Sequence, residues 1–190
     1  MLAPALTAVL LLQPTASAGQ AAPGGWDPDR PWAIGVRAAG WSAGYTAPGV
    51  GGQIQYRPTS RFGIEAFWNS FALPQQALLM HDHIVGFHTY FPVAGSDRWL
   101  LAPEAGLCVD FRFQTDLSQA GPDSSDIRFG FHGGLLAEAR LSTLFSLGLR
   151  GTATGYLGNA AGVDGWTSSA SPSLDLRPVG QVTATLNVRP

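Results

Sequence analysis

Hydrophobic side chains alternate with small or polar ones through most of the chain after Trp32. In residues 32–38, Trp32, Ile34 and Val36 take even positions, and the odd positions hold Ala, Gly and Arg37. Successive side chains of a strand point to opposite faces, so a period of two predicts strands with one apolar face. Eight segments show this pattern: 32–38, 50–56, 62–68, 83–91, 101–113, 127–141, 145–157 and 182–188. The chain is therefore predicted to be all-β with eight antiparallel strands.

The connections between these segments alternate in length. Short ones occupy residues 57–61, 92–98 and 142–143, and longer ones occupy residues 42–49, 69–80, 114–126 and 158–177. Barrels of bacterial outer membranes have short periplasmic turns and long outer loops. The alternation therefore predicts an up-and-down transmembrane β-barrel, with residues 158–177 as its longest external loop.

Aromatic residues support the same orientation. Those near the short connections all take the apolar parity of their strands: Trp32, Tyr56, Phe62, Phe91, Trp99 and Phe145. Aromatic side chains gather where a membrane meets water, so these six are predicted to form a periplasmic-side girdle. On the same parity, Phe87, Phe111, Phe129 and Leu149 are predicted to face lipid.

The opposite parity carries most of the charge of the predicted strands. These residues are Arg37, Glu65, Glu104, Asp110, Arg112, Arg128, Glu138, Arg140 and Arg150. Eight strands enclose a space that side chains can just fill, so five arginines and four carboxylates would share one narrow lumen. This near balance predicts a plugged lumen with an ion-pair network, since an ion-selective pore needs a clear excess of one sign.

The first residues have a different character. The run from Leu2 to Leu12 is apolar, and Ala16-Ser17-Ala18 supplies the small residues that a signal peptidase recognises. This pattern predicts a signal peptide over residues 1–18, a flexible lead-in over 19–31 and the barrel over 32–190. A single helical anchor is the alternative, but the apolar run is about half of the roughly 20 residues that a spanning helix needs.

Composition narrows the possible partners. Only 13% of residues are charged, the chain has no Lys, and its formal net charge is -2. No basic surface is available to bind nucleic acid. The expected partners are outer-membrane lipid and an extracellular ligand or protein bound through the long loops, and the barrel is expected to be a monomer.

Histidines raise the questions of metal binding and catalysis. His81-Asp82-His83 offers two imidazoles on one strand face, but no third ligand follows at a recognisable spacing, so no metal site is predicted. His88 and His132 take the inward parity, without a nearby Ser on the outer face. Neither a cofactor nor an enzymatic activity is therefore expected. Pro103 lacks a backbone N–H, which predicts a bulge or a later strand start there.

The eight alternating segments and their connections resemble those of the small outer-membrane barrel proteins of the OmpA and OmpX type, the outer-membrane β-barrel domain family. The resemblance implies a non-enzymatic protein of the bacterial outer membrane with a structural or surface-interaction role. One alternative is a soluble exported barrel of the lipocalin sort, with apolar faces turned inward around a small hydrophobic ligand. Another is a lipid A-modifying barrel enzyme with a His and a Ser on its lipid-facing surface.

Overall fold

The computed structural model describes residues 27–42, 46–75, 78–116, 124–157 and 174–190. Nine strands lie in these ranges: β1 (Trp32–Ser42), β2 (Thr46–Thr59), β3 (Phe62–Gln75), β4 (Leu78–Tyr90), β5 (Ala94–Gly95), β6 (Trp99–Asp116), β7 (Ser124–Arg140), β8 (Phe145–Leu157) and β9 (Leu174–Val188). No helix in this part of the chain is long and apolar enough to cross a membrane. The predicted signal peptide lies outside the described residues.

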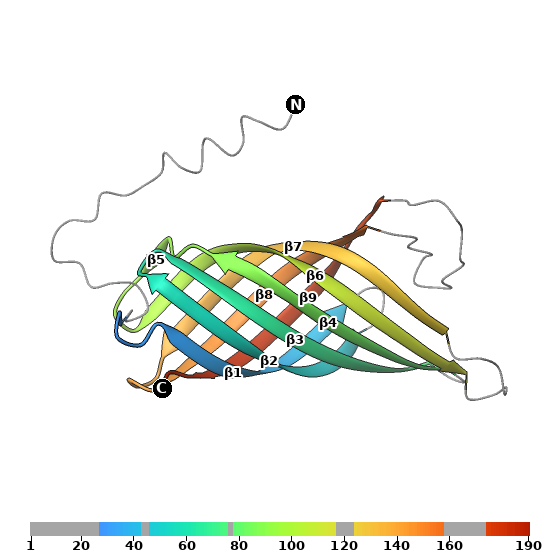
Figure 1. Cartoon of the computed structure of the whole chain (residues 1–190), viewed down its shortest axis with the longest axis horizontal. Helices are drawn as coiled ribbons and strands as arrows, with labels where there is room; N and C mark the ends of the chain where they lie inside the picture. The colour runs from blue at the N-terminus through green and yellow to red at the C-terminus, as the bar shows by residue number, and fades with distance from the viewer. Residues whose placement is uncertain (1–26, 43–45, 76–77, 117–123, 158–173) are drawn as a thin grey trace, which may run out of the picture.

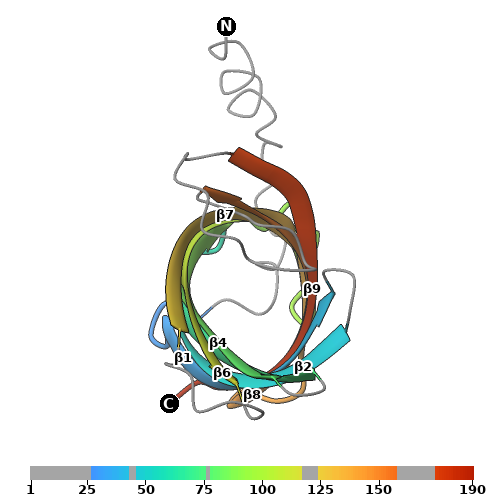
Figure 2. The ribbon, with the colours of Figure 1, turned by 90° about the vertical axis from the view of Figure 1, so that its right-hand side faces the viewer.

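The long strands close into a barrel. Each pairs antiparallel with its sequence neighbours, and β1 also pairs with β9, from Ile34 opposite Val188 to Ser42 opposite Gly180. The two-residue β5 only extends the turn before β6, so eight of the nine strands form the wall. Figure 2 shows the ring that they make. The predicted all-β fold with eight antiparallel strands is confirmed.

The barrel wall begins at Trp32 and finishes at Val188, and both residues lie at the same end of the barrel. Figure 1 shows β5 and the C-terminus at this end, where β1 begins and the β2–β3 turn lies. The β2–β3 and β7–β8 turns there are tight: Arg61 N donates to Thr59 Oγ1 at 3.3 Å, and Phe145 N donates to Ser142 Oγ at 3.1 Å. We call this end the turn end and the opposite one the outer end.

Burial follows the period of two. Along β1, residues of one parity are buried and those of the other are exposed, with Val36 at 66% exposure. The exposed parity is mostly apolar, and no Arg, Asp or Glu takes it where the side chains of the long strands are described. The apolar face thus points outward, where it fits a hydrocarbon environment. This orientation contradicts the soluble lipocalin-like alternative, which needs apolar faces turned inward.

Strands at the outer end are longer than the alternating pattern predicted. Strand covers most of the predicted long connections 42–49 and 69–80 and both ends of 114–126, because β2 begins at Thr46, β3 continues to Gln75, β6 continues to Asp116 and β7 begins at Ser124. Similarly, β9 begins at Leu174, inside the predicted loop 158–177. Gly, Pro and Asn suggested turns in these regions, but unbroken pairing with the neighbouring strand keeps the backbone extended.

The predicted irregularity at Pro103 is absent. Pro103 lies opposite Leu135 in an unbroken β6–β7 ladder, and β6 begins four residues earlier, at Trp99. The carbonyl of Pro103 accepts from Phe91 N at 3.0 Å, on the side of β4. In a strand, the N and the carbonyl of one residue face the same neighbour, so the missing donor points where β4 has already ended. Pro103 therefore removes no hydrogen bond between β6 and β7.

Four of the six predicted girdle residues are largely exposed, with Trp32 at 51% and Trp99 at 48%. Tyr56 and Phe62 are half-buried, because each packs against a girdle neighbour. The Trp32 and Tyr56 ring centroids lie 4.4 Å apart, and those of Phe62 and Phe91 lie 5.4 Å apart. Of the residues predicted to face lipid, Phe87, Phe129 and Leu149 are exposed and Phe111 is half-buried.

The outward face gives a test of depth. Leu149 lies in the middle of β8 and is 57% exposed, whereas Leu141 follows β7 at the turn end and is 63% exposed. Leu149→Arg should lower the free energy of unfolding by about 2–4 kcal/mol, and Leu141→Arg by about 0–1 kcal/mol, because an arginine costs most at the bilayer midplane. Denaturant titration in lipid vesicles measures both. Equal costs at the two positions would contradict a lipid-facing β8.

Candidate functional site

The inward parity builds a polar lumen. Its buried charged residues are Arg37, Arg57, Glu65, Asp82, Glu104, Asp110, Arg112, Arg128, Glu138, Arg150 and Arg189. Among the described residues, six buried arginines thus share the interior with five buried carboxylates. Charges in such a space are stable only when they are paired and hydrogen-bonded.

Glu65 on β3 is the centre of this lumen. Its Oε1 accepts from Arg37 Nη1 at 2.8 Å and from Arg150 Nη1 at 2.7 Å. Its Oε2 accepts from Arg150 Nη2 at 2.9 Å and from Gln55 Nε2 at 2.7 Å. The carboxylate is fully buried and joins strands β1, β2, β3 and β8 across the interior. Since Arg150 binds both oxygens, this contact is the bidentate, charge-assisted kind.

A second carboxylate and two histidines extend the centre. Arg150 Nε donates to Glu104 Oε2 at 2.7 Å, and His88 Nε2 lies 2.9 Å from Glu65 Oε1. His88 Nδ1 lies 3.1 Å from His132 Nε2. Because a carboxylate only accepts, His88 Nε2 carries a proton, and in a neutral ring Nδ1 then accepts from His132 Nε2. The connected side chains, which we call the Glu65 cluster, come from β1, β2, β3, β4, β6, β7 and β8.

Two arginine–aspartate pairs lie nearer the outer end. Arg112 Nε and Nη2 donate to the two oxygens of Asp82 at 2.7 Å and 2.5 Å. Arg128 pairs with Asp110. Each guanidinium also lies over an aromatic ring: Arg112 is 5.8 Å from the centroid of Trp41, and Arg128 is 4.2 Å from that of Tyr156. These cation–π contacts add to the ion pairs in a desolvated setting.

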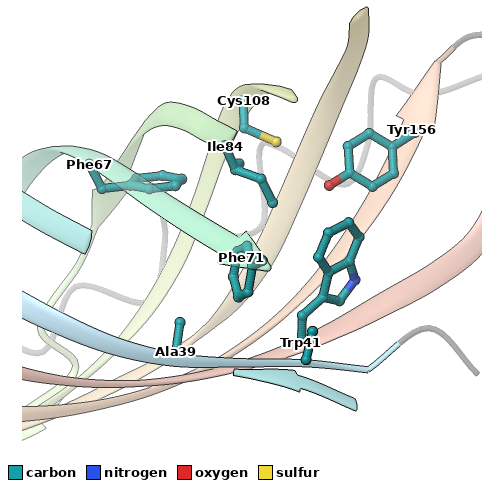
Figure 3. Packing of buried hydrophobic residues seen from close by; sticks show 8 residues of the cluster. Ala39, Trp41, Phe67, Phe71, Ile84, Cys108 and Tyr156 are labelled. Atoms are coloured by element: carbon teal, nitrogen blue, oxygen red, sulfur yellow. The ribbon is translucent and has the colours of Figure 1, made fainter. Parts of the chain in front are cut away.

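Apolar side chains pack around these charges. One buried cluster consists of Ala39, Trp41, Ala47, Phe67, Phe71, Ile84, Cys108 and Tyr156, and Figure 3 shows its side chains projecting from several strands into the shared interior. A smaller cluster at the turn end holds Tyr90, Leu100, Ala102 and Leu136. Gly63 makes room there, since a Cβ on Gly63 would lie 2.1 Å from Cζ of Tyr90. One cavity beside His88 and His132 measures about 10 Å³, room for roughly one water molecule.

Eight of the nine residues expected in the lumen are buried there. The exception is Arg140, which is half-buried at the end of β7, where its Nε donates to the Ser142 carbonyl at 3.1 Å. Glu138, expected among them, pairs with Arg189. The expected residues form separate groups: the Glu65 cluster, two Arg–Asp pairs and the Glu138 pair.

Three buried charges were not expected in the lumen. Arg57 lies in the predicted short connection 57–61, and Asp82 and Arg189 lie just outside the predicted segments 83–91 and 182–188. All three nonetheless continue the inward parity of their strands, Arg57 after Gln55 and Arg189 after Asn187. Extending the alternation by one or two positions would have found them.

The histidines lie on different faces. His81 and His83 take the outward parity of β4, whereas Asp82 points inward to Arg112. No three His, Cys, Asp or Glu side chains in the described ranges are arranged to hold a metal ion. His88 and His132 are enclosed in the lumen at 1% and 7% exposure. A lipid substrate on the outer surface therefore has no access to them.

No family model matches this sequence, and neither does any curated protein. Solved structures with similar folds exist. The N-terminal β-barrel domain of OprF from Pseudomonas aeruginosa aligns with 82% of this chain and 96% of its own, with a TM-score of 0.55 and 9% identity. Ail, the attachment invasion locus protein of Yersinia pestis, aligns with 83% of this chain and 95% of its own, with a TM-score of 0.50 and 13% identity.

At such identities the similarity concerns the fold alone. The fold is that of the small eight-stranded outer-membrane β-barrels, as the sequence predicted.

Glu65 gives the sharpest test of the lumen network. Glu65→Gln leaves Arg37 and Arg150 facing a neutral group, so it should lower the free energy of unfolding by about 3–5 kcal/mol. Adding Arg37→Gln should recover part of this loss, because Arg150 then keeps Glu104 as its carboxylate. Urea titration in vesicles measures the cycle, with Asp97→Asn at an exposed turn as the control. Additive losses at positions 65 and 37 would contradict the network.

Proposed function

We propose that this chain is a non-enzymatic, monomeric protein of a bacterial outer membrane, exported by the signal peptide at residues 1–18. Its lumen is closed, and its outer end contacts an extracellular ligand or protein. The observation that carries the proposal is the inversion of polarity across the wall: apolar side chains outside, and ion pairs around Glu65 inside. A barrel with this polarity is stable in lipid.

The closed lumen is supported by size and charge. Eight-stranded barrels have room for side chains and little else. Here Arg37, Glu65, Glu104 and Arg150 meet in the middle of the barrel, each at 5% exposure or less. An ion-selective wall needs one dominant sign, whereas six arginines against five carboxylates nearly cancel. Both observations favour a plug over a pore.

Conductance tests this part of the proposal. Purified protein in a planar bilayer should give no stable current steps, because the Glu65 cluster occupies the middle of the lumen. Glu65→Ala combined with Arg150→Ala removes the two best-connected side chains and should introduce measurable conductance. Barrel closure of both proteins is checked by their heat-dependent shift on gels. A reproducible conductance of the unmodified protein would overturn the closed lumen.

The interaction role is assigned to the outer end, because loops on a rigid barrel commonly carry recognition. The connection between β8 and β9, residues 158–173, is the longest in the chain. Ail, a similar barrel, is named for attachment and invasion. A corresponding contact with a host or neighbouring-cell surface is the proposed use of this end.

An epitope tag tests the orientation. Inserted between residues 165 and 166, the tag should bind antibody on intact cells, since these residues follow the end of β8 that lies opposite the turn end. The same tag between Ser60 and Arg61, in the β2–β3 turn, should bind antibody only after the outer membrane is permeabilised. Labelling of the second tag alone on intact cells would show that the barrel is inverted.

A further inference from the structure

Arginines recur at the turn end in one sequence context. Arg61 directly precedes Phe62, Arg98 precedes Trp99 and Arg140 precedes Leu141, and Arg30 stands two residues before Trp32. Arg61, Arg98 and Arg140 thus lie directly beside a residue of the outward apolar parity, and Arg30 lies two positions from one. The β2–β3 turn, the segment before β6 and the segment leading into β1 each carry one of them, and Arg140 is the last residue of β7.

The four arginines lie just beyond the apolar surface. Trp32, Trp99 and Leu141 are 51%, 48% and 63% exposed, so they mark where the outward apolar band ends. Arg61 and Arg98 are exposed, and Arg30 and Arg140 are half-buried. A strand advances about 3.3 Å per residue, and arginine stems extend along apolar surfaces with the charge in the polar layer. The guanidinium groups can therefore reach the level of lipid phosphates.

Their spacing around the barrel distinguishes a ring from a patch. In the order of the wall, Arg30 occurs before β1, Arg61 between β2 and β3, Arg98 before β6, and Arg140 at the end of β7. The four positions are thus spread around the circumference, with Arg98 and Arg140 on the neighbouring strands β6 and β7. A globular partner would contact one side of such a ring, whereas a lipid leaflet surrounds it completely.

Two members of the ring lie opposite each other. Arg140 N donates to the Arg98 carbonyl at 2.6 Å, which places the two residues side by side across β6 and β7. Like charges in directly opposite positions repel, and a shared anion relieves that repulsion. Aspartates at this end are the half-buried Asp27 and the exposed Asp29 and Asp97. A phosphate accepts two parallel N–H bonds from a guanidinium, which suits a ring made only of arginine.

We propose that Arg30, Arg61, Arg98 and Arg140 form a ring that binds the phosphate groups of anionic lipids in the leaflet at the turn end. This inference rests on the proposed membrane location and deepens it by naming the lipid class and the leaflet. The ring anchors the barrel at a fixed depth, with the aromatic girdle in the interface directly above it.

Tryptophan quenching tests the ring in the full-length protein. The chain is refolded into phosphatidylcholine vesicles that also contain one lipid with brominated acyl chains. This brominated lipid is phosphatidylglycerol in one sample and phosphatidylcholine in the other. Trp32 and Trp99 neighbour the ring and report which lipid lies beside it. Brominated phosphatidylglycerol should quench more strongly at equal mole fraction. When one arginine is replaced by glutamine, the preference of the neighbouring lipid position for phosphatidylglycerol over phosphatidylcholine should fall about fivefold.

Matched variants separate charge from structure. Replacing all four arginines by glutamine should bring the preference close to one, whereas Asp27→Asn with Asp29→Asn and Asp97→Asn should increase it. Neither set touches the lumen contacts of Glu65, so both proteins should keep their heat-dependent gel shift. Unchanged preference after the four glutamine substitutions, or none in the unmodified protein, would overturn the ring.

The outcomes also separate this inference from the membrane location. If brominated phosphatidylcholine quenches normally but phosphatidylglycerol has no advantage, the barrel is in the membrane and the ring is wrong. Absence of quenching by either lipid would instead contradict the membrane location itself. If the arginines are needed for sedimentation with purified cell-wall polymer and not for lipid preference, the ring belongs to that polymer and the lipid assignment fails.

Discussion

The contact between Arg150 and Glu65 is the interaction on which the interior depends. An apolar outer surface forces the polar side chains of eight strands into one narrow space, where an unpaired charge is costly. Arg150 resolves this by binding both oxygens of Glu65 and one of Glu104 at once. The remaining donors of the Glu65 cluster then arrange around a carboxylate that is already neutralised. Wall and lumen are therefore two consequences of one constraint, the polarity of the surroundings.

Side-chain parity was predictable from the sequence because it depends only on the two-residue period of a strand. It correctly separated Val36 from Arg37 and Leu149 from Arg150. Partner choice was not predictable, since it depends on which strands lie across the barrel from each other. Glu65 and Arg150 are 85 positions apart and belong to non-adjacent strands, so no local pattern relates them.

The sequence predicted the ends of the strands less accurately than the parity of their side chains. Asn69 was assigned to a loop, yet it lies within β3 and pairs with Gly51, because a paired neighbour outweighs local turn preference. Pro103 shows the opposite case, in which a residue that should disturb a strand does not, since its missing donor faces the end of β4. Both depend on the register of a neighbouring strand.

Contacts of β9 have a consequence for barrel assembly. A slip of two residues between strands keeps every apolar side chain outside, so polarity alone does not select one alignment. Asn187 on β9 accepts from Gln53 on β2 at 2.7 Å, and Arg189 after β9 pairs with Glu138 on β7. Neither partner strand is the one that closes the seam, β1. Both contacts depend on the register of β9, so they favour the native alignment over one that is shifted by two residues.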